Sequence, residues 1–229
     1  MWIAKKGDER KKEFLETAVE IFKTKGYGKT SINDILKQMN ITKGAFYYYF
    51  ESKEALLHEI VNQLTEKMQT VVKDIANRND LSAVSKLEHI FNATHQLREE
   101  NQSAYYPLYA LQKRDENAFI ARKFMQKSLS INKQFIELII TQGIQEGSFK
   151  TSNATETAEL YIRLTSLCKE KIADIISDSS YLSGHKTLYK KAEDLITFYQ
   201  EALERILGAE KGTLNFLNKT KEYISGMIS

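Results

Sequence analysis

One segment of the sequence, residues 30–53, constrains the fold more than any other, because its pattern is typical of two short helices joined by a tight turn. The second half carries three consecutive tyrosines between Phe46 and Phe50. These two phenylalanines are four residues apart and therefore share one face of a helix. A helix this short cannot bury all three tyrosines. The spacing predicts a helix with one face in a core and its other faces exposed.

Composition indicates a helical globular protein. The chain has 229 residues, 42% of them hydrophobic, which is enough for one large or two modest domains. It contains only one proline and ten glycines and is rich in good helix formers. We therefore expect an all-α fold.

Charge and targeting signals exclude several classes of protein. The net charge is only +3, so contact with nucleic acid must be local, unlike that of a protein that coats nucleic acid indiscriminately. No segment has the pattern of a signal peptide, and no apolar run is long enough to cross a bilayer. The single cysteine, Cys168, cannot form an internal disulfide. These features predict a cytoplasmic protein with no membrane association.

Apolar spacing and turn residues predict the helices. Gly26 ends the first helix, Thr30 or Ser31 caps the second, Asn40 tolerates a left-handed turn and Thr42 caps the third. The predicted ranges are about 8–25, 32–39, 43–50, 53–76, 82–100, 106–113, 117–145, 154–176 and 186–207. Residues 212–229 are spaced for one more amphipathic helix, to which the sequence gives no role.

Residues 10–60 resemble the DNA-binding domain of the tetracycline-repressor (TetR) family. The resemblance rests on Thr30, the run Thr-Lys-Gly at 42–44, the aromatic run at 47–50 and the downstream Lys53. The sequence departs from the family pattern at Leu36, where alanine is frequent, and at Asn40, where glycine is frequent. Neither departure affects the positions expected to face DNA.

The resemblance implies an architecture and a function. It implies a three-helix helix-turn-helix DNA-binding domain at residues 1–55 and a helical effector-binding and dimerisation domain at 56–229, with dimer helices at about 154–207. The protein is expected to be a dimeric, sequence-specific transcriptional regulator. It would act as a repressor that a small-molecule effector releases from a double-stranded DNA operator. No cofactor is expected.

The chemistry of the segment supports contact with DNA. Gly44 lets the helix backbone approach the floor of the major groove, and Ala45 can contact a thymine methyl group. Lys43 suits a guanine edge or a phosphate, whereas tyrosine and threonine hydroxyls suit phosphate oxygens. The alternative is that the tyrosines are core residues, and we expect partial packing for one of them, such as Tyr47. The predicted DNA-binding residues are Thr30, Ser31, Thr42, Lys43, Gly44, Ala45, Tyr47, Tyr48, Tyr49 and Lys53.

The last predicted long helix has apolar residues at intervals of three and four. They are Leu188, Leu195, Tyr199, Leu203 and Ile206. By the resemblance, these residues would pair with their copies in a four-helix dimer interface. The alternative is that they close the core of a single chain.

The middle of the chain is where the resemblance places an effector. Tyr105, Tyr106, Tyr109, Phe119, Phe124, Phe135 and Tyr161 are candidates to line an apolar cavity. Aromatic residues at helical spacing are more often packing residues, and the sequence does not separate the two roles. An alternative function is an effector-free DNA-binding factor regulated by a protein partner.

Catalysis is not expected. The histidines at 58, 89, 95 and 185 have no metal-ligand spacing, and Cys168 lies in an apolar helical pattern with no activating neighbour beyond two lysines. We therefore predict neither an enzyme nor a metal site.

Overall fold

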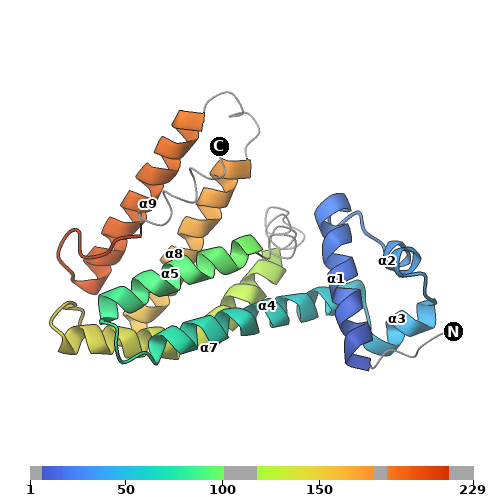
Figure 1. Ribbon diagram of the computed structural model, residues 1–229, viewed down its shortest axis with the longest axis horizontal. Coiled ribbons are helices and arrows are strands. Elements are labelled where there is room, and N and C mark those ends of the chain that lie inside the picture. The colour runs from blue at the N-terminus through green and yellow to red at the C-terminus, as the bar shows by residue number, and fades with distance from the viewer. Residues whose placement is uncertain (1–6, 101–117, 178–184, 217–229) are drawn as a thin grey trace. The chain divides into compact units, whose positions relative to one another are not determined.

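The computed structural model describes residues 7–100, 118–177 and 185–216, and these residues form helices joined by turns, without a strand (Figure 1). The helices are α1 (Gly7–Lys25), α2 (Ile32–Met39), α3 (Lys43–Tyr49), α4 (Lys53–Ala76), α5 (Ala83–Glu100), α7 (Ala118–Gln145), α8 (Ala154–Ser177) and α9 (His185–Leu207). The all-α prediction is confirmed. The bounds agree with the predicted ranges to within about one residue, whereas the helix predicted at 106–113 lies outside the described residues.

Two of the predicted turn residues, Ser31 and Asn40, act as their chemistry predicts. Ser31 is the N-cap of α2, and its hydroxyl oxygen accepts a hydrogen bond from the Asp34 amide in a capping box. Asn40 ends α2 with φ 50°, in the left-handed region where asparagine is tolerated. Thr42 is the N-cap of α3, but its side chain makes no capping hydrogen bond.

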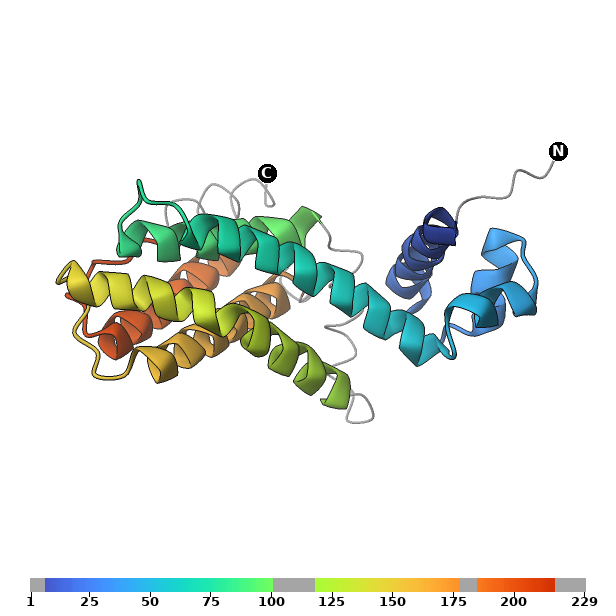
Figure 2. The same ribbon diagram turned by 90° about the horizontal axis from the view of Figure 1, so that it is seen from below.

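Contacts divide the chain into two compact units, the first within Met1–Lys67 and Arg98–Lys127, and the second within Met68–Leu97 and Ser128–Ser229. In the first unit, α1 packs on α2, and α2 on α3 (Figure 2). The buried core joins residues of α1, α2 and α3 to Leu56, Leu57, Ile60 and Val61 of α4. The start of α4 therefore shares the core of the first three helices. The boundary predicted between residues 55 and 56 stays a prediction.

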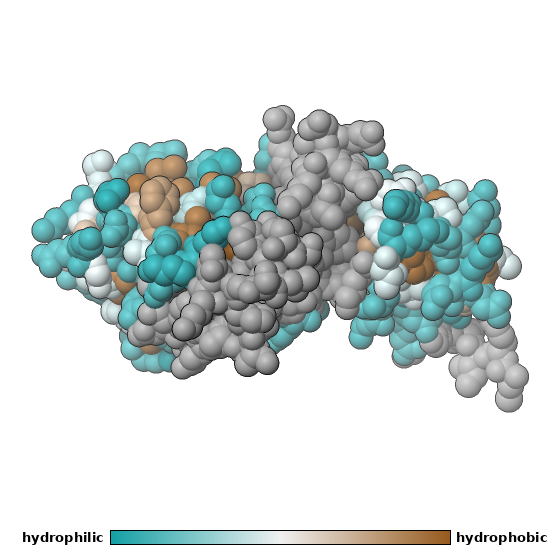
Figure 3. All heavy atoms as spheres, turned by 90° about the horizontal axis from the view of Figure 1, so that it is seen from above, coloured by the Kyte–Doolittle hydropathy of each residue, from teal (hydrophilic) through white to brown (hydrophobic). Residues whose placement is uncertain are grey.

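In the second unit α8 and α9 lie side by side (Figure 1). Tyr161 of α8 is 2% exposed and donates a hydrogen bond of 2.9 Å from its hydroxyl to the Leu87 carbonyl of α5. Apolar residues reach the described surface in patches among hydrophilic ones (Figure 3). The exposed large apolar residues of this unit are Leu138, Ile144, Leu160, Leu167 and Phe198.

Two of the five residues predicted for the dimer interface are buried within the single chain. Tyr199 and Leu203 are buried within the single chain, at 6% and 0% exposure, because they face the core of the second unit. Leu195 and Ile206 are half-buried, and the side chain of Leu188 lies outside the described ones. For Tyr199 and Leu203, the structure supports the alternative of core packing.

Few of the predicted effector residues can be placed. Tyr105, Tyr106 and Tyr109 lie outside the described residues, as do the side chains of Phe119 and Phe124. Phe135 is half-buried, and the fully buried Tyr161 packs in the core with its hydroxyl bonded to a helix carbonyl.

Residues 213–216 are not helical, unlike the amphipathic helix predicted from residue 212 onward. Gly212 turns the chain with φ 84°, and three successive backbone amides then donate to side chains of α9 and α5. The acceptors are Glu204 for Leu214 at 2.9 Å, Glu88 for Asn215 at 2.7 Å and Gln200 for Phe216 at 3.2 Å. The Phe216 ring stacks on Phe91 with centroids 4.2 Å apart. These side-chain acceptors take the place of the backbone acceptors of a helix.

Glu88 makes the stability of this contact depend on pH. Burial raises the pKa of the Glu88 carboxyl above its ordinary value of 4.5, and the hydrogen bond from Asn215 opposes that shift. The folded state therefore favours the protonated acid, and stability falls as the pH rises through the ordinary value toward the folded-state pKa. We expect Glu88→Gln, which keeps an acceptor but has no charge, to raise the melting temperature at pH 7.

The matched control is Glu201→Gln, because Lys211 holds the pKa of Glu201 below its usual range. The control should lower the melting temperature at pH 7. The Glu88 difference should shrink when the melting curves are repeated near pH 4, where the wild-type Glu88 carboxyl is protonated, whereas the Glu201 difference should be lost only at lower pH because the pKa of Glu201 is lowered. A lower melting temperature for Glu88→Gln at pH 7 would contradict the assigned cause.

Candidate nucleic-acid interface

An aromatic core fixes the orientation of α3. Phe46 and Phe50 are 0% and 4% exposed, and the ring centroid of each lies 5.7 Å from that of Phe14 in α1. Both contacts have edge-to-face geometry, which is favourable for aromatic pairs. The predicted core face of α3 is confirmed, and the core determines which side chains point outward.

The outward residues of α3 match most of the predicted set. Tyr48 is 82% exposed and Tyr47 is 48% exposed. Lys43 and Gly44 are also exposed, and the Lys43 ammonium lies 5.7 Å from the centroid of the Tyr47 ring. Together they present a cation, two phenols and a bare stretch of backbone on one short helix. Thr42 and Ala45, exposed and half-buried respectively, flank this stretch.

Neither the backbone conformation nor the packing within the protein requires glycine at position 44. It is not among the described glycines with positive φ, and a Cβ atom built on it would meet nothing within 4 Å. Glycine inside a helix is about 0.5–1 kcal/mol less favourable than alanine. The space around Gly44 is therefore open to the approach of an outside partner.

Two residues of the predicted set belong to the interior. Thr30 is 2% exposed, and its hydroxyl donates to the Gly26 carbonyl at 2.7 Å, so that the side chain closes the turn before α2. Tyr49 is half-buried, with its ring centroid 5.6 Å from that of Phe14. Tyr47, although 48% exposed, also packs partly, with its ring edge-on to that of Phe46 at 5.5 Å. Burial and the internal bond to Gly26 argue against DNA contact by the Thr30 side chain, which stays a prediction.

Lys53 is occupied within the chain. Its ammonium donates to the carbonyls of Tyr27 at 2.8 Å and Thr30 at 2.7 Å, and lies 4.1 Å from the centroid of the Tyr27 ring. Burial lowers the pKa of Lys53, partly offset by Asp34. The predicted phosphate contact would compete with two hydrogen bonds that are already formed.

A charged network fixes the start of α2. The Lys25 ammonium lies 2.7 Å from an Asp34 carboxylate oxygen, which also accepts from the Ser31 amide and hydroxyl at 2.7 Å each. Lys25 first, and then Ser31, hold the pKa of the Asp34 carboxyl well below its usual range. Ser31 is exposed, so it lies at the surface while its hydroxyl caps the helix.

The interface is locally basic although the chain is nearly neutral. Residues 26–53 contain four lysines and two acidic residues. Two of the lysines, Lys29 and Lys37, are exposed and were not among the predicted contacts. The excess of lysines over acidic residues in this segment could have indicated them. The prediction considered the pattern of α3 and therefore named Lys43.

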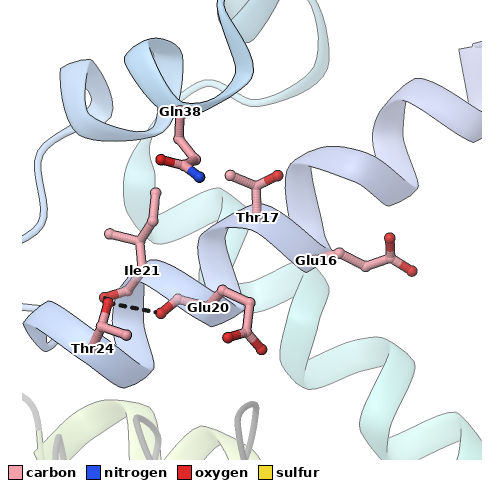
Figure 4. A pocket seen from close by; sticks show the side chains of 6 residues that line it. All are labelled: Glu16, Thr17, Glu20, Ile21, Thr24 and Gln38. Atoms are coloured by element: carbon pink, nitrogen blue, oxygen red, sulfur yellow. Dashed lines mark hydrogen bonds between the residues drawn. The ribbon is translucent and has the colours of Figure 1, made fainter.

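A hollow of about 400 Å³ lies between α1 and α2 (Figure 4). Gln38 of α2 extends toward Thr17 and Ile21 of α1. The remaining lining residues, Glu16, Glu20 and Thr24, also belong to α1. Two carboxylates make this hollow a poor match for a phosphate backbone, which supports assigning the interface to α3.

The described residues also lack features of two other classes of protein. Within them, no group of three or more His, Cys, Asp or Glu side chains is arranged to hold a metal ion. None of the described helices combines the length and the apolar character needed to cross a membrane.

Comparisons with known proteins agree with the fold. Residues 14–60 match the family model described as bacterial regulatory proteins, tetR family. The HTH-type transcriptional regulator YuxN of Bacillus subtilis is 44% identical over 72 residues, which span 31% of this chain and 25% of that relative. The HTH-type transcriptional repressor KstR2 of Rhodococcus jostii is 24% identical over 159 residues, covering 68% of this chain and 76% of that repressor.

Solved structures extend the similarity of fold along the chain. A tetR-family regulatory protein from Rhodococcus RHA1 has a TM-score of 0.58 at 22% identity, and the match covers 89% of this chain and 99% of that one. At this identity the likeness concerns the fold alone, which is a helix-turn-helix domain followed by a helical domain. Residues 14–60 thus match the tetR family of bacterial regulatory proteins, and the fold of the chain is that of solved tetR-family regulators.

Proposed function

We propose that this protein is a homodimeric repressor that binds a palindromic DNA operator through α3 and leaves it when a small molecule binds the C-terminal helical domain. The outward side of α3 carries the proposal. Lys43 and Gly44 are exposed there beside Tyr47 and Tyr48, on a helix whose other side is held by Phe46 and Phe50. The similarity to KstR2, a transcriptional repressor, supports repression. Action on DNA places the protein in the cytoplasm.

Each exposed group has a role suited to its chemistry. Gly44 and Ala45 admit the edges of the bases, and Lys43 donates to a guanine or a phosphate. The hydroxyls of Thr42, Tyr47 and Tyr48 donate to phosphate oxygens and set the register on the duplex. Ser31 lies at the exposed start of α2, but its amide and hydroxyl already donate to Asp34, and a phosphate contact would compete with those bonds.

One such module reads few base pairs, so two copies on two half-sites are needed for specificity. Exposed apolar residues on the adjacent helices α8 and α9 support dimerisation there. Leu160 and Leu167 of α8 are 45% and 40% exposed, and Phe198 of α9 is 63% exposed. Large apolar side chains with this exposure on neighbouring helices suit a four-helix interface between two copies.

We expect Phe198→Glu to weaken the dimer, because a carboxylate would be buried between the two copies without a cation. A central aromatic residue of an interface typically contributes 2 kcal/mol or more, so the dimer dissociation constant should rise by about 30-fold or more. Analytical ultracentrifugation over a concentration series measures it.

Leu138→Glu is the matched control, because Leu138 of α7 is 59% exposed and lies on neither α8 nor α9. It should leave the dimer intact. An unchanged dimer in the Phe198 variant, or equal losses in both variants, would contradict an interface at α8 and α9.

A polar group in the helical interior supports the effector part of the proposal. Asn132 of α7 is 4% exposed, and its amide nitrogen donates to the Ser128 carbonyl at 3.1 Å. Its carbonyl oxygen is buried and has no hydrogen-bond partner within the described part of the chain. A buried acceptor of this kind is costly unless a donor reaches it. A donor group on the effector would satisfy it.

Selection of bound duplexes from a random DNA pool tests the function directly. Enrichment of a palindrome bound by a dimer is the expected result, and no enrichment by protein shown to be folded would overturn the proposal. Thermal melting against a metabolite library then tests the effector. An effector at 100 times its dissociation constant stabilises the protein by about 2.7 kcal/mol. The alternative, regulation by a protein partner, predicts no such shift.

A further inference from the structure

Lys53 connects the two ends of the helix-turn-helix segment. Thr30 directly precedes the N-cap of α2, and Lys53 begins α4 after α3 has ended. The hydrogen bond of 2.7 Å from the Lys53 ammonium to the Thr30 carbonyl therefore closes a loop that contains both α2 and α3. The second bond, 2.8 Å to the Tyr27 carbonyl, attaches the same ammonium to the turn after α1.

The turn that receives Lys53 is itself well ordered by hydrogen bonds. The Thr30 amide donates to the Tyr27 carbonyl at 3.1 Å, and the Thr30 hydroxyl donates to the Gly26 carbonyl at 2.7 Å. The Tyr27 ring packs on Phe22 with centroids 5.1 Å apart and also lies 4.1 Å from the Lys53 ammonium. Two carbonyl oxygens and one aromatic face thus form an ordered binding site for the ammonium, which we call the Lys53 seat.

An ammonium has three N–H donors, and the seat takes two of them. We propose that Lys53 is a positioning residue, an inference that rests on the proposed function. By clamping the Tyr27–Thr30 turn to α4, Lys53 holds α3 at the angle that DNA requires. It does not act as a phosphate contact. Lys43 and the exposed hydroxyls make the contacts with DNA themselves.

The two roles differ in their dependence on salt. Loss of a phosphate contact reduces the slope of log affinity against log salt concentration by about 1. Loss of the clamp should leave the slope unchanged, since the number of neutralised phosphates stays the same. Affinity for the selected operator should still fall, by about 10- to 100-fold, because hydrogen bonds to a charged group are lost.

The test compares Lys53→Met, Lys53→Arg and Lys43→Met with the wild type by binding isotherms over a salt series, well below the melting temperature. Hydrogen exchange of the amides at residues 27–31 is measured without DNA. We expect Lys53→Met to weaken binding with an unchanged slope and to speed exchange in the turn. Lys53→Arg, which keeps charge and donors, should bind more tightly than Lys53→Met. Lys43→Met should reduce the slope and leave the turn unaffected.

Two results would overturn the inference. A slope reduced by about 1 in Lys53→Met, with exchange in the turn unchanged, would make Lys53 a phosphate contact. A lower melting temperature with unchanged affinity would make its role purely structural. If Lys53→Met does not fold, Lys53→Gln replaces it, since the glutamine amide can occupy part of the seat. Failure of the wild type to select any DNA would count against the proposed function, whereas the exchange measurement would still report on the clamp.

Discussion

Replacing Gly44 with leucine is expected to abolish specific binding to the operator while leaving the fold intact. A side chain at this position meets nothing within 4 Å inside the protein, so the added atoms project outward from α3. In the groove they would occupy the space that the helix backbone needs for its approach to the bases. Affinity should fall toward the non-specific value, which is typically about 10³-fold weaker or more.

Stability should move in the opposite direction. Leucine is a better helix former than glycine, by somewhat less than about 1 kcal/mol, so the melting temperature should stay the same or rise slightly. Binding isotherms on the selected operator and thermal melting of the same preparation measure the two effects. Gln63→Leu is the control, because it places the same neutral side chain at an exposed position of α4. A Gly44→Leu variant that binds as the wild type does would remove α3 from the interface.

The helix-turn-helix could be predicted from sequence because short-range rules determine it. Spacing alone places Phe46 and Phe50 on one face, and both are buried. Ser31 and Asn40 have side-chain and backbone preferences that fix the start and end of α2 wherever the rest of the chain lies. Helix bounds and the buried face of α3 follow from such local chemistry.

The sequence predicts less well which groups a given side chain contacts, because the contacting residues lie far apart in the sequence. Lys53 lies 23 residues from Thr30, whose carbonyl it binds, and no local sequence pattern predicts that hydrogen bond. Tyr199 and Leu203 share the apolar spacing expected of a dimer face, yet they face their own core. Phe198, one position away from Tyr199, is exposed instead. Periodicity identifies an apolar stripe but does not say which molecule covers it.

Residues 213–216 illustrate the same limit at the end of the chain. Their apolar spacing was compatible with a helix, but Glu204, Glu88 and Gln200 supply acceptors for three successive amides in a non-helical segment. Glu88 and Asn215 are 127 residues apart, so this pairing is a property of the folded unit. Local propensity was overridden by acceptors that only the tertiary structure brings together.

Gly143→Ala is expected to cause the largest loss of stability among the changes considered. A Cβ atom on Gly143 of α7 would lie 2.0 Å from Cδ2 and 2.3 Å from Cε2 of the Phe149 ring, which is 1% exposed. The ring cannot easily move aside, because the Phe149 amide is itself bonded to the Gly143 carbonyl at 3.1 Å. Overpacking of a core costs about 1–3 kcal/mol, and expulsion of a buried phenylalanine about 3–5 kcal/mol.

We therefore expect a loss of about 3 kcal/mol and a melting temperature lower by about 6–12 °C. Gly147→Ala is the control for backbone strain: Gly147 has φ 76° but open space around it, so alanine there should cost only about 1–2 kcal/mol. A double-mutant cycle isolates the cause. If the contact with the ring is responsible, Gly143→Ala combined with Phe149→Ala should be no less stable than Phe149→Ala alone. Additive losses would instead mean that Gly143 is needed for the backbone of α7 itself.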